Sequence, residues 1–161
     1  MAKNSKKLKD TPVIENRKAR YDYAIEETLE CGMVLEGSEV KSIRDGKISI
    51  GEGYVRAQVT PPALYMHSVN ISPYGPAGVL NHIPTRTRKL LANRSEINKM
   101  IKAVSVKGMT IVPLKVYFKG GFAKVLIGLG KGKSQTDKRH SIGEREAKRD
   151  IDRAMSKRKG W

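Results

Sequence analysis

The segment from Thr110 to Leu129 constrains the fold more than any other part of the chain. Apolar residues alternate with polar or smaller ones at Val112, Leu114, Val116 and Phe118. Such alternation is typical of a strand with one buried face. Gly120-Gly121 follows, and two glycines supply the positive φ angles of a two-residue hairpin turn. The segment therefore predicts a β-hairpin, with Pro113 at an edge or a bulge because proline cannot donate to a ladder.

Several shorter apolar segments predict more strands and one main helix. Strands are expected at 21–35, broken by Gly32, and at 47–59 and 64–71, with turns at Pro61-Pro62 and 72–78. Helical spacing predicts a helix at 95–106, because one stripe carries Ile97, Met100, Ile101 and Val104. One or two helical turns are expected at 39–44, closed by Gly46. Together these elements predict a mainly β fold, an OB-fold-like closed or partly open barrel with flanking helices.

The excess of positive charge lies mostly at the two ends of the chain. The formal net charge is +16, and residues 131–161 alone hold eleven lysines and arginines against five acidic residues. We expect a basic flexible arm at 1–12, a barrel at 13–130 and a basic tail at 131–161. The tail has too little apolar surface to order alone, so it should fold on a partner, with a helix from about Ile142. The surplus of positive charge favours an anionic partner, either nucleic acid or a membrane surface.

Other classes of protein find little support in the sequence. Cys31 is the one cysteine, so no internal disulfide can form, and we interpret it as buried and not as a reactive thiol. No signal peptide or membrane span is recognisable, which predicts a cytoplasmic protein. The histidines are far apart and no phosphate-binding loop is present, so no metal, cofactor or enzymatic activity is expected. The glycine-rich run 128–133 is interpreted as a flexible cationic hinge.

Several long motifs resemble one family, the SsrA-binding proteins (small protein B, SmpB). The first lies at 16–20, where the sequence is Asn-Arg-Lys-Ala-Arg, and is followed by 22–23 and 25–27. The resemblance continues at 37, 39–47, 71–73, 84–91, 112–117, 131–133 and 137–139. It covers roughly residues 13–155 in the order of the family, and a set of long motifs in that order is far more specific than one short pattern.

The resemblance implies a function as well as a fold. It implies that the chain binds the tRNA-like domain of transfer-messenger RNA. It further implies that the chain delivers this RNA to stalled ribosomes, where the tail occupies the empty mRNA channel at the decoding centre of the small subunit. Incomplete proteins are then tagged for degradation, a process called trans-translation. We expect no membrane partner and a monomer. Composition alone leaves open a structural ribosomal or general RNA-binding protein, and an RNA-modifying enzyme would need a cofactor loop or activated nucleophile that is not visible.

The resemblance also assigns roles to individual residues. By position, the RNA-binding face of the family maps to Asn16, Tyr23, Glu30, Leu91 and Lys124. Basic residues of the matching motifs are also expected to bind RNA, namely Arg17, Lys18, Arg20, Arg88, Lys89, Lys131 and Lys133. Those expected to act with the tail on the ribosome are Tyr21, Gly132, Asp137, Lys138, Arg139, His140 and Met155. Core packing is the alternative for Tyr23 and Leu91, and Asn16 and Lys124 would otherwise be ordinary surface residues. Glu30 could accept a hydrogen bond from a base or a ribose hydroxyl.

Three positions depart from the family pattern. Ser134 stands where a lysine is usual, which would remove one phosphate contact. Tyr21 stands where a histidine is common, so a ring is kept and a titratable group is lost. Ala154 replaces a larger aliphatic residue on the expected face of the tail helix.

Overall fold

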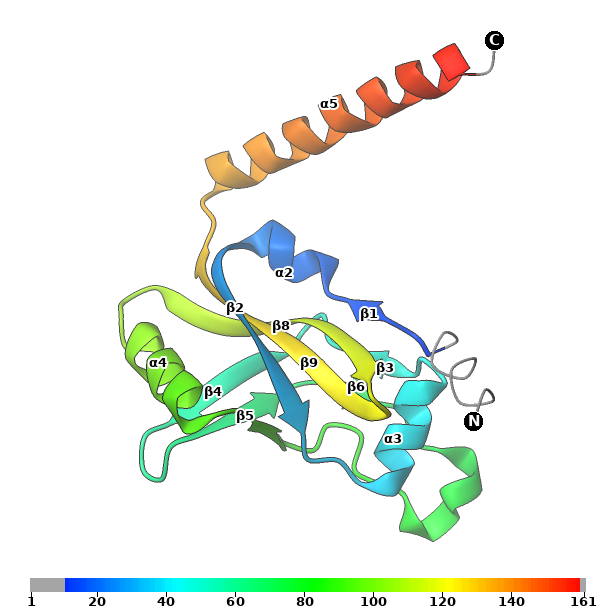
Figure 1. Ribbon diagram of the computed structural model, residues 1–161, viewed down its shortest axis with the longest axis vertical. Helices are drawn as coiled ribbons and strands as arrows, with labels where there is room; N and C mark the ends of the chain where they lie inside the picture. Colours follow the sequence, from blue (N-terminus) through cyan, green and yellow to red (C-terminus); the bar gives the residue numbers. More distant parts are fainter. Residues whose placement is uncertain (1–10, 160–161) are drawn as a thin grey trace.

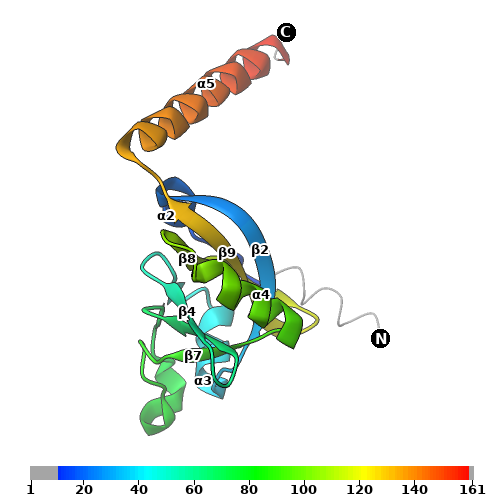
Figure 2. The same ribbon diagram turned by 90° about the vertical axis from the view of Figure 1, so that its left-hand side faces the viewer.

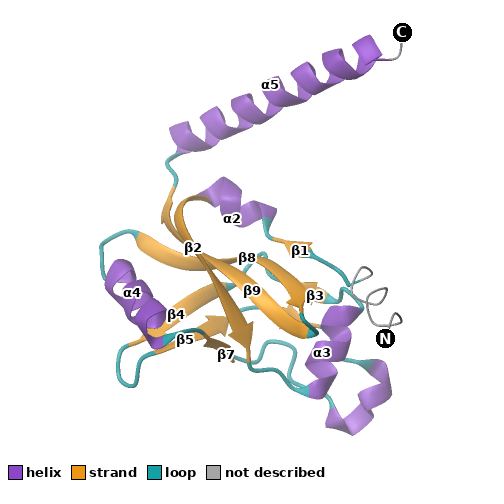
Figure 3. Cartoon of the chain, viewed as in Figure 1, coloured by secondary structure: helices purple, strands orange, loops and turns teal. Residues whose placement is uncertain are grey.

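The strands of the computed structural model form an antiparallel sheet that closes on itself (Figures 1 and 3). The structure describes residues 11–159, without the side chains of 135–137, 141 and 157–159. The order across the sheet is β1-β8-β4-β5-β7-β2-β9, and β9 also pairs with β8, which closes the barrel. The strands of this sheet are β1 (Ile14–Glu15), β2 (Tyr23–Met33), β4 (Tyr54–Gln58), β5 (Ala63–His67), β7 (Arg88–Leu91), β8 (Met109–Lys119) and β9 (Phe122–Gly132). This architecture confirms the mainly β fold class.

The remaining elements flank the barrel. A small second sheet pairs β3 (Ile48–Ser49) with β6 (Asn70–Ile71). The helices are α2 (Arg17–Asp22), α3 (Gly37–Arg44), the 3-10 helix η1 (Gly75–Leu80), α4 (Arg94–Val104) and α5 (Gln135–Lys159). Figure 2 shows α5 rising from one end of the barrel, beyond α2, while α3 lies toward the opposite end.

The hairpin predicted from the alternation is the longest ladder of the sheet. Strands β8 and β9 pair from Met109 opposite Lys131 to Lys119 opposite Phe122. Gly120 and Gly121 have φ angles of 60° and 82°, as a two-residue turn of this kind requires. The register shifts next to Pro113, which confirms the expected bulge.

The core fills the barrel with the inward-facing residues of its strands. The side chains of Leu64, Leu90, Ile111 and Val125 are at most 1% exposed. Cys31 lies among them with no exposed surface, and burial raises the pKa of its thiol to about 12. The thiol is therefore protonated and unreactive at neutral pH, which confirms the interpretation of Cys31 as a buried apolar residue.

The two helices expected within the barrel region are present. Helix α4 begins after Asn93, whose backbone N–H donates to the Glu96 carboxylate at 3.3 Å. Its stripe buries Ile97 and Met100, and the helix packs against β4, β8 and β9. Helix α3 ends at Arg44, and the left-handed Gly46, with φ of 73°, follows its end as predicted.

Several local predictions were wrong, among them the strand expected at 47–59, which divides into β3 and β4 on either side of a turn at 51–52. Residues 21–22, expected to begin a strand, end helix α2 (Arg17–Asp22), which the Asn16 side chain caps. Gly32 does not break β2. The strand expected at 64–71 divides at Ser68, whose φ is 58°. Gly128 and Gly130, expected in a hinge, are buried within β9, where an added Cβ would lie 2.7 Å from Leu114 and 3.0 Å from the Ala24 carbonyl oxygen, respectively.

The tail is drawn as one long helix that leaves the barrel beside α2 (Figure 1). It begins at Gln135, seven residues before the expected start near Ile142. The expectation that the tail is disordered in the free protein concerns solution behaviour and stays a prediction. Among the described residues, no helix combines the length and the hydropathy needed to cross a membrane.

Candidate nucleic-acid interface

A hollow on the outer side of β2, β7 and β9 brings together residues that are distant in the sequence. Its volume is about 560 Å³. We call it the groove, and it is lined by Leu29, Glu30, Gly32, Leu91, Ala92, Asn93, Glu96 and Lys124. The predicted RNA-binding residues Glu30, Leu91 and Lys124 therefore lie on one surface.

Strand pairing explains how the groove forms. Gly32 in β2 is the register partner of Leu91 in β7 and of Lys124 in β9. A Cβ atom at Gly32 would lie 3.3 Å from Leu91 Cβ and 3.8 Å from Lys124 Nζ, so the glycine keeps the floor of the groove open. Leu91 is 53% exposed, which excludes core packing as its role. The groove thus offers an apolar side chain and a cation next to each other.

The Glu30 carboxylate is held in place by β8, the first strand of the hairpin. The Tyr117 hydroxyl donates to Glu30 Oε2, and Lys119 Nζ lies 3.4 Å from Oε1. The hydrogen bond from Tyr117, with the nearby lysines Lys119 and Lys124, lowers the pKa of Glu30, although partial burial opposes this. Burial and the bond to Glu30 raise the pKa of Tyr117 to about 12. Glu30 is therefore an ionised acceptor at neutral pH, and Tyr117 remains its donor.

A second cluster joins α2 to the base of the tail. Lys138 Nζ lies 3.3 Å from Asp22 Oδ1 and 5.6 Å from the centroid of the Tyr21 ring. Lys133 donates through Nζ to the Arg20 carbonyl oxygen at 3.2 Å, and through its backbone N–H to the Asp22 carbonyl oxygen at 2.8 Å. We call these contacts the tail anchor. They bring Tyr21 and Lys138 together, two of the residues expected to act with the tail.

Asn16 lies beneath the surface and not on it, contrary to the expectation. Its side chain is 4% exposed, and its Oδ1 accepts from the Ala19 backbone N–H at 3.1 Å. Its Nδ2 donates to the Ile50 carbonyl oxygen at 3.1 Å and to the Pro113 carbonyl oxygen at 2.8 Å. The amide is thus occupied inside the protein, and Asn16 positions α2, whose outer residues Arg17, Lys18 and Arg20 are exposed.

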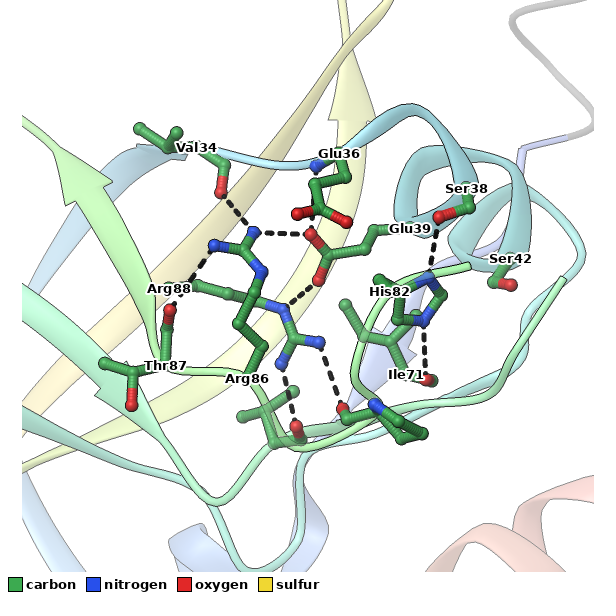
Figure 4. A network of polar contacts seen from close by, with 12 residues as sticks. Val34, Glu36, Ser38, Glu39, Ser42, Ile71, His82, Arg86, Thr87 and Arg88 are labelled. Atoms are coloured by element: carbon green, nitrogen blue, oxygen red, sulfur yellow. Dashed lines mark hydrogen bonds and ion pairs between the residues drawn. The ribbon is translucent and has the colours of Figure 1, made fainter. Parts of the chain in front are cut away.

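Arg88, expected to bind RNA, has no exposed surface, and its guanidinium is buried in the network of Figure 4. Its Nε donates to Glu39 Oε2, its Nη1 to the Val69 carbonyl oxygen at 2.8 Å and its Nη2 to the Pro84 carbonyl oxygen at 3.0 Å. Both side chains of the Arg88–Glu39 pair have no exposed surface. Presenting Arg88 to RNA would break this pair and leave Glu39 buried without it.

Further contacts complete the network around Glu39. Its Oε1 accepts from Arg86 and from the Glu36 backbone N–H, the latter at 2.9 Å. Burial opposes ionisation of Glu39, but these hydrogen bonds and the charge of Arg88 prevail and lower its pKa. His82 bridges the Ser38 hydroxyl and the Ile71 carbonyl oxygen, each at 2.8 Å. The network therefore ties α3 to the start of β7, the strand that carries Leu91 into the groove.

The other predicted residues lie outside the groove. Lys89, Lys131, Gly132, Arg139, His140 and Met155 are exposed. Tyr23 is half-buried and packs against the small core of Ala19, Val112 and Leu114, so packing accounts for much of its surface. The side chain of Asp137 lies outside the described residues. Tyr117 and Lys119 were not predicted, because nothing in the sequence indicates that they face Glu30.

The chain is similar to proteins of one family over most of its length. The sequence model described as "SmpB protein" matches residues 13–157. An SsrA-binding protein of Exiguobacterium sp. strain AT1b is 49% identical over 157 residues, covering 98% of this chain and 99% of the relative. An SsrA-binding protein of Geobacillus sp. strain WCH70 is 50% identical over 146 residues, covering 91% of this chain and 93% of the relative.

A solved structure is similar in fold as well as in sequence. It superimposes with a TM-score of 0.65 and 42% identity, covering 81% of this chain and 94% of its own chain. It is described as "tmRNA-SmpB: a journey to the center of the bacterial ribosome".

Proposed function

The chain belongs to the SmpB protein family, and from this premise we propose that it binds tmRNA and acts with it on the bacterial ribosome in trans-translation. The relatives are named for binding SsrA, and the similar structure is described as tmRNA with SmpB in the ribosome. The protein works in the cytoplasm as an RNA-binding protein and not as an enzyme.

The groove and the tail have different roles in this proposal. The groove holds the tRNA-like domain of tmRNA, with Lys124 beside a phosphate, Leu91 against an apolar part of the RNA and Glu30 as an acceptor. The tail enters the mRNA channel of the small subunit, where no message remains. One observation carries this proposal, namely that Glu30, Leu91 and Lys124 meet around an open floor at Gly32.

Sequencing of the RNA that copurifies with the protein tests the proposal directly. Selective enrichment of one RNA with a tRNA-like domain is the expected result. Bulk ribosomal RNA without that enrichment would instead identify a general RNA-binding protein, the alternative that the net charge of +16 by itself permits.

Replacing Glu30 with alanine is expected to weaken binding to tmRNA, although the variant is more cationic. A purely electrostatic interface would bind more tightly after loss of a negative charge. Loss of an acceptor for a base amino group or a ribose hydroxyl costs about 1–3 kcal/mol. The dissociation constant, measured by filter binding at fixed salt, shows whether the substitution weakens or tightens binding.

Tyr117→Phe provides the matched control for Glu30. It removes the hydroxyl that orients the carboxylate but keeps the ring and the charge of the groove. An affinity between those of the wild type and Glu30→Ala is expected. Unchanged or tighter binding by Glu30→Ala would remove Glu30 from the RNA site.

Binding is expected to depend on salt through Lys124. Each phosphate neutralised by the protein releases counterions, so log affinity falls with log salt by about 0.7–0.9 per contact. Lys124→Ala should lower the affinity and should reduce this slope by the amount expected for about one phosphate contact. Titrations at several salt concentrations measure both, and Lys47→Ala, an exposed lysine outside the groove, serves as the control. A slope equal to that of the wild type would place Lys124 away from the phosphates.

A further inference from the structure

The outer face of β4, β5 and β7 carries aromatic residues that the groove does not account for. Arg56 in β4 is the register partner of Tyr65 in β5, and Tyr65 is the register partner of Lys89 in β7. Directly opposed residues of an antiparallel sheet project to the same face. Arg56, Tyr65 and Lys89 therefore form a row in which an aromatic ring lies between two cations.

The neighbouring row of the same face adds a second aromatic surface. Tyr54 opposes His67, and their rings stack with centroids 5.3 Å apart and planes inclined by 10°. Tyr54 is 39% exposed, so its ring is accessible from solvent. The Thr87 hydroxyl lies 3.4 Å from His67 Nδ1, at the edge of the pair. The stacked pair thus presents a flat surface that is already fixed in orientation.

These two rows border a hollow with no negative charge in its lining. Its volume is about 530 Å³, and it is lined by Arg56, Ala57, Gln58, Tyr65, His67 and Thr87. Flat aromatic rings stack with nucleic-acid bases, and basic side chains beside them neutralise the phosphates, which is how proteins bind single-stranded RNA. The chemistry of this face therefore matches unpaired nucleotides.

The face continues into the groove along β7. Lys89 and Leu91 are exposed while Arg88 and Leu90 are buried, so Lys89 and Leu91 project from the same side of the strand. Residues two apart in a strand are separated by roughly 7 Å, about the spacing of neighbouring nucleotides in an extended strand. An RNA that contacts Leu91 can therefore continue over Lys89 and Tyr65 without crossing a gap.

We propose that this aromatic–basic face binds an unpaired stretch of the same RNA that occupies the groove. Bases stack on Tyr65 and on the Tyr54–His67 pair, and Arg56 and Lys89 contact the phosphates. The identity of that RNA as tmRNA rests on the proposed function, whereas the affinity of the face for single-stranded RNA does not.

The first test measures binding of a short fluorescent oligoadenylate to the full chain. Tyr65→Leu, which keeps an apolar side chain and removes the ring, should weaken binding roughly five- to hundred-fold, the range found for loss of one stacked base. Inorganic polyphosphate, which has charge but no bases, should bind Tyr65→Leu as it binds the wild type. Equal oligoadenylate affinities for Tyr65→Leu and the wild type would overturn the proposal.

A charge reversal provides a test that does not depend on the packing of Tyr65. Arg56→Glu changes an exposed side chain, and Lys107→Glu makes the same change of charge at an exposed position outside the hollow. Arg56→Glu should weaken oligoadenylate binding clearly more than Lys107→Glu does. Equal losses would mean that the face contributes only to the general positive charge, and the proposal would fail.

Chemical probing of tmRNA bound to each variant separates this proposal from the proposed function. The wild type should protect from modification both the nucleotides bound in the groove, here called the groove footprint, and an adjacent unpaired stretch. Tyr65→Leu should lose protection of that stretch alone. Leu91→Ala should lose the groove footprint. Identical footprints for Tyr65→Leu and the wild type would overturn the second site, whereas no footprint from the wild type would instead contradict tmRNA binding itself.

Discussion

Replacing Glu39 with glutamine is expected to lower the free energy of unfolding by about 3–5 kcal/mol, the usual cost of removing one partner of a buried ion pair. Glu39 and Arg88 have no exposed surface, and each Glu39 oxygen accepts from an arginine. Glutamine keeps the shape but has one acceptor oxygen, and its NH₂ group would point a donor at the other arginine. The buried charge of Arg88 would then be uncompensated. Urea unfolding followed by circular dichroism measures the loss.

The pH dependence gives an independent check on the same pair. The folded protein lowers the pKa of Glu39 below its ordinary value of 4.5. The unfolded chain therefore binds this proton more readily, so the stabilisation by Glu39 is complete above about pH 4.5 and is lost as the pH falls through the lower folded-state pKa. Glu39→Gln should lack this component, and its stability should fall less steeply on acidification than that of the wild type.

Glu52→Gln is the matched control, because Glu52 pairs with Lys18 at 2.5 Å on the surface, where both side chains are largely exposed. Exposed pairs contribute little to stability. A loss for Glu39→Gln no larger than that for Glu52→Gln would show that the network does not stabilise the fold. RNA affinity of folded Glu39→Gln should also fall, because β7 carries Leu91 from the network to the groove.

Truncation after Ser134 is expected to abolish tagging of stalled chains while most tmRNA affinity remains. Glu30, Leu91 and Lys124 all lie within the barrel, and the tail is the part proposed to occupy the mRNA channel. The boundary follows from the structure, because β9 extends to Gly132 and Lys133 still bonds to Asp22. Cutting after Gly130 would remove the pairs of Lys131 with Met109 and of Gly132 with Tyr23.

The decisive measurement determines the tmRNA dissociation constant and the tagging rate in parallel on the truncated protein. Replacement of residues 137–139 by alanine should likewise abolish tagging and leave most tmRNA affinity, without shortening the chain. Loss of both activities together would make the tail part of the RNA site, and survival of both would contradict its role in the channel. In the free full-length protein, residues beyond the tail anchor should give sharp, poorly dispersed NMR signals.

The elements predicted correctly are those whose signals are local. The β8–β9 hairpin follows from alternation and two turn glycines, and α4 follows from its apolar stripe. Helix α2 buries Ala19 alone, so its sequence has no apolar period to detect, and its start depends on bonds from Asn16 to residues far along the chain. Tertiary contacts therefore determine where α2 lies, and its local signal is limited to the cap that Asn16 provides for the Ala19 backbone N–H.

The candidate site was predictable to the extent that family motifs mark positions. Glu30, Leu91 and Lys124 came from the resemblance, and strand register then brought them together. Arg88 is predicted to bind RNA as a basic residue of the family motif at 84–91, because a buried arginine has the same sequence signature as an exposed one until its partner is known. That partner, Glu39, lies 49 positions away and is recognisable only from the fold.

The tail anchor has a thermodynamic consequence. Lys138 contacts Asp22 and Tyr21 on α2, the helix whose outer side carries Arg17, Lys18 and Arg20. A ligand on those basic side chains that favours one position of Lys138 sets the direction in which α5 leaves the barrel. Such coupling is reciprocal, since each binding event changes the affinity of the other by the same factor. If RNA bound at α2 raises the affinity of the tail for its partner, then binding of that partner raises the affinity of α2 for RNA by the same factor.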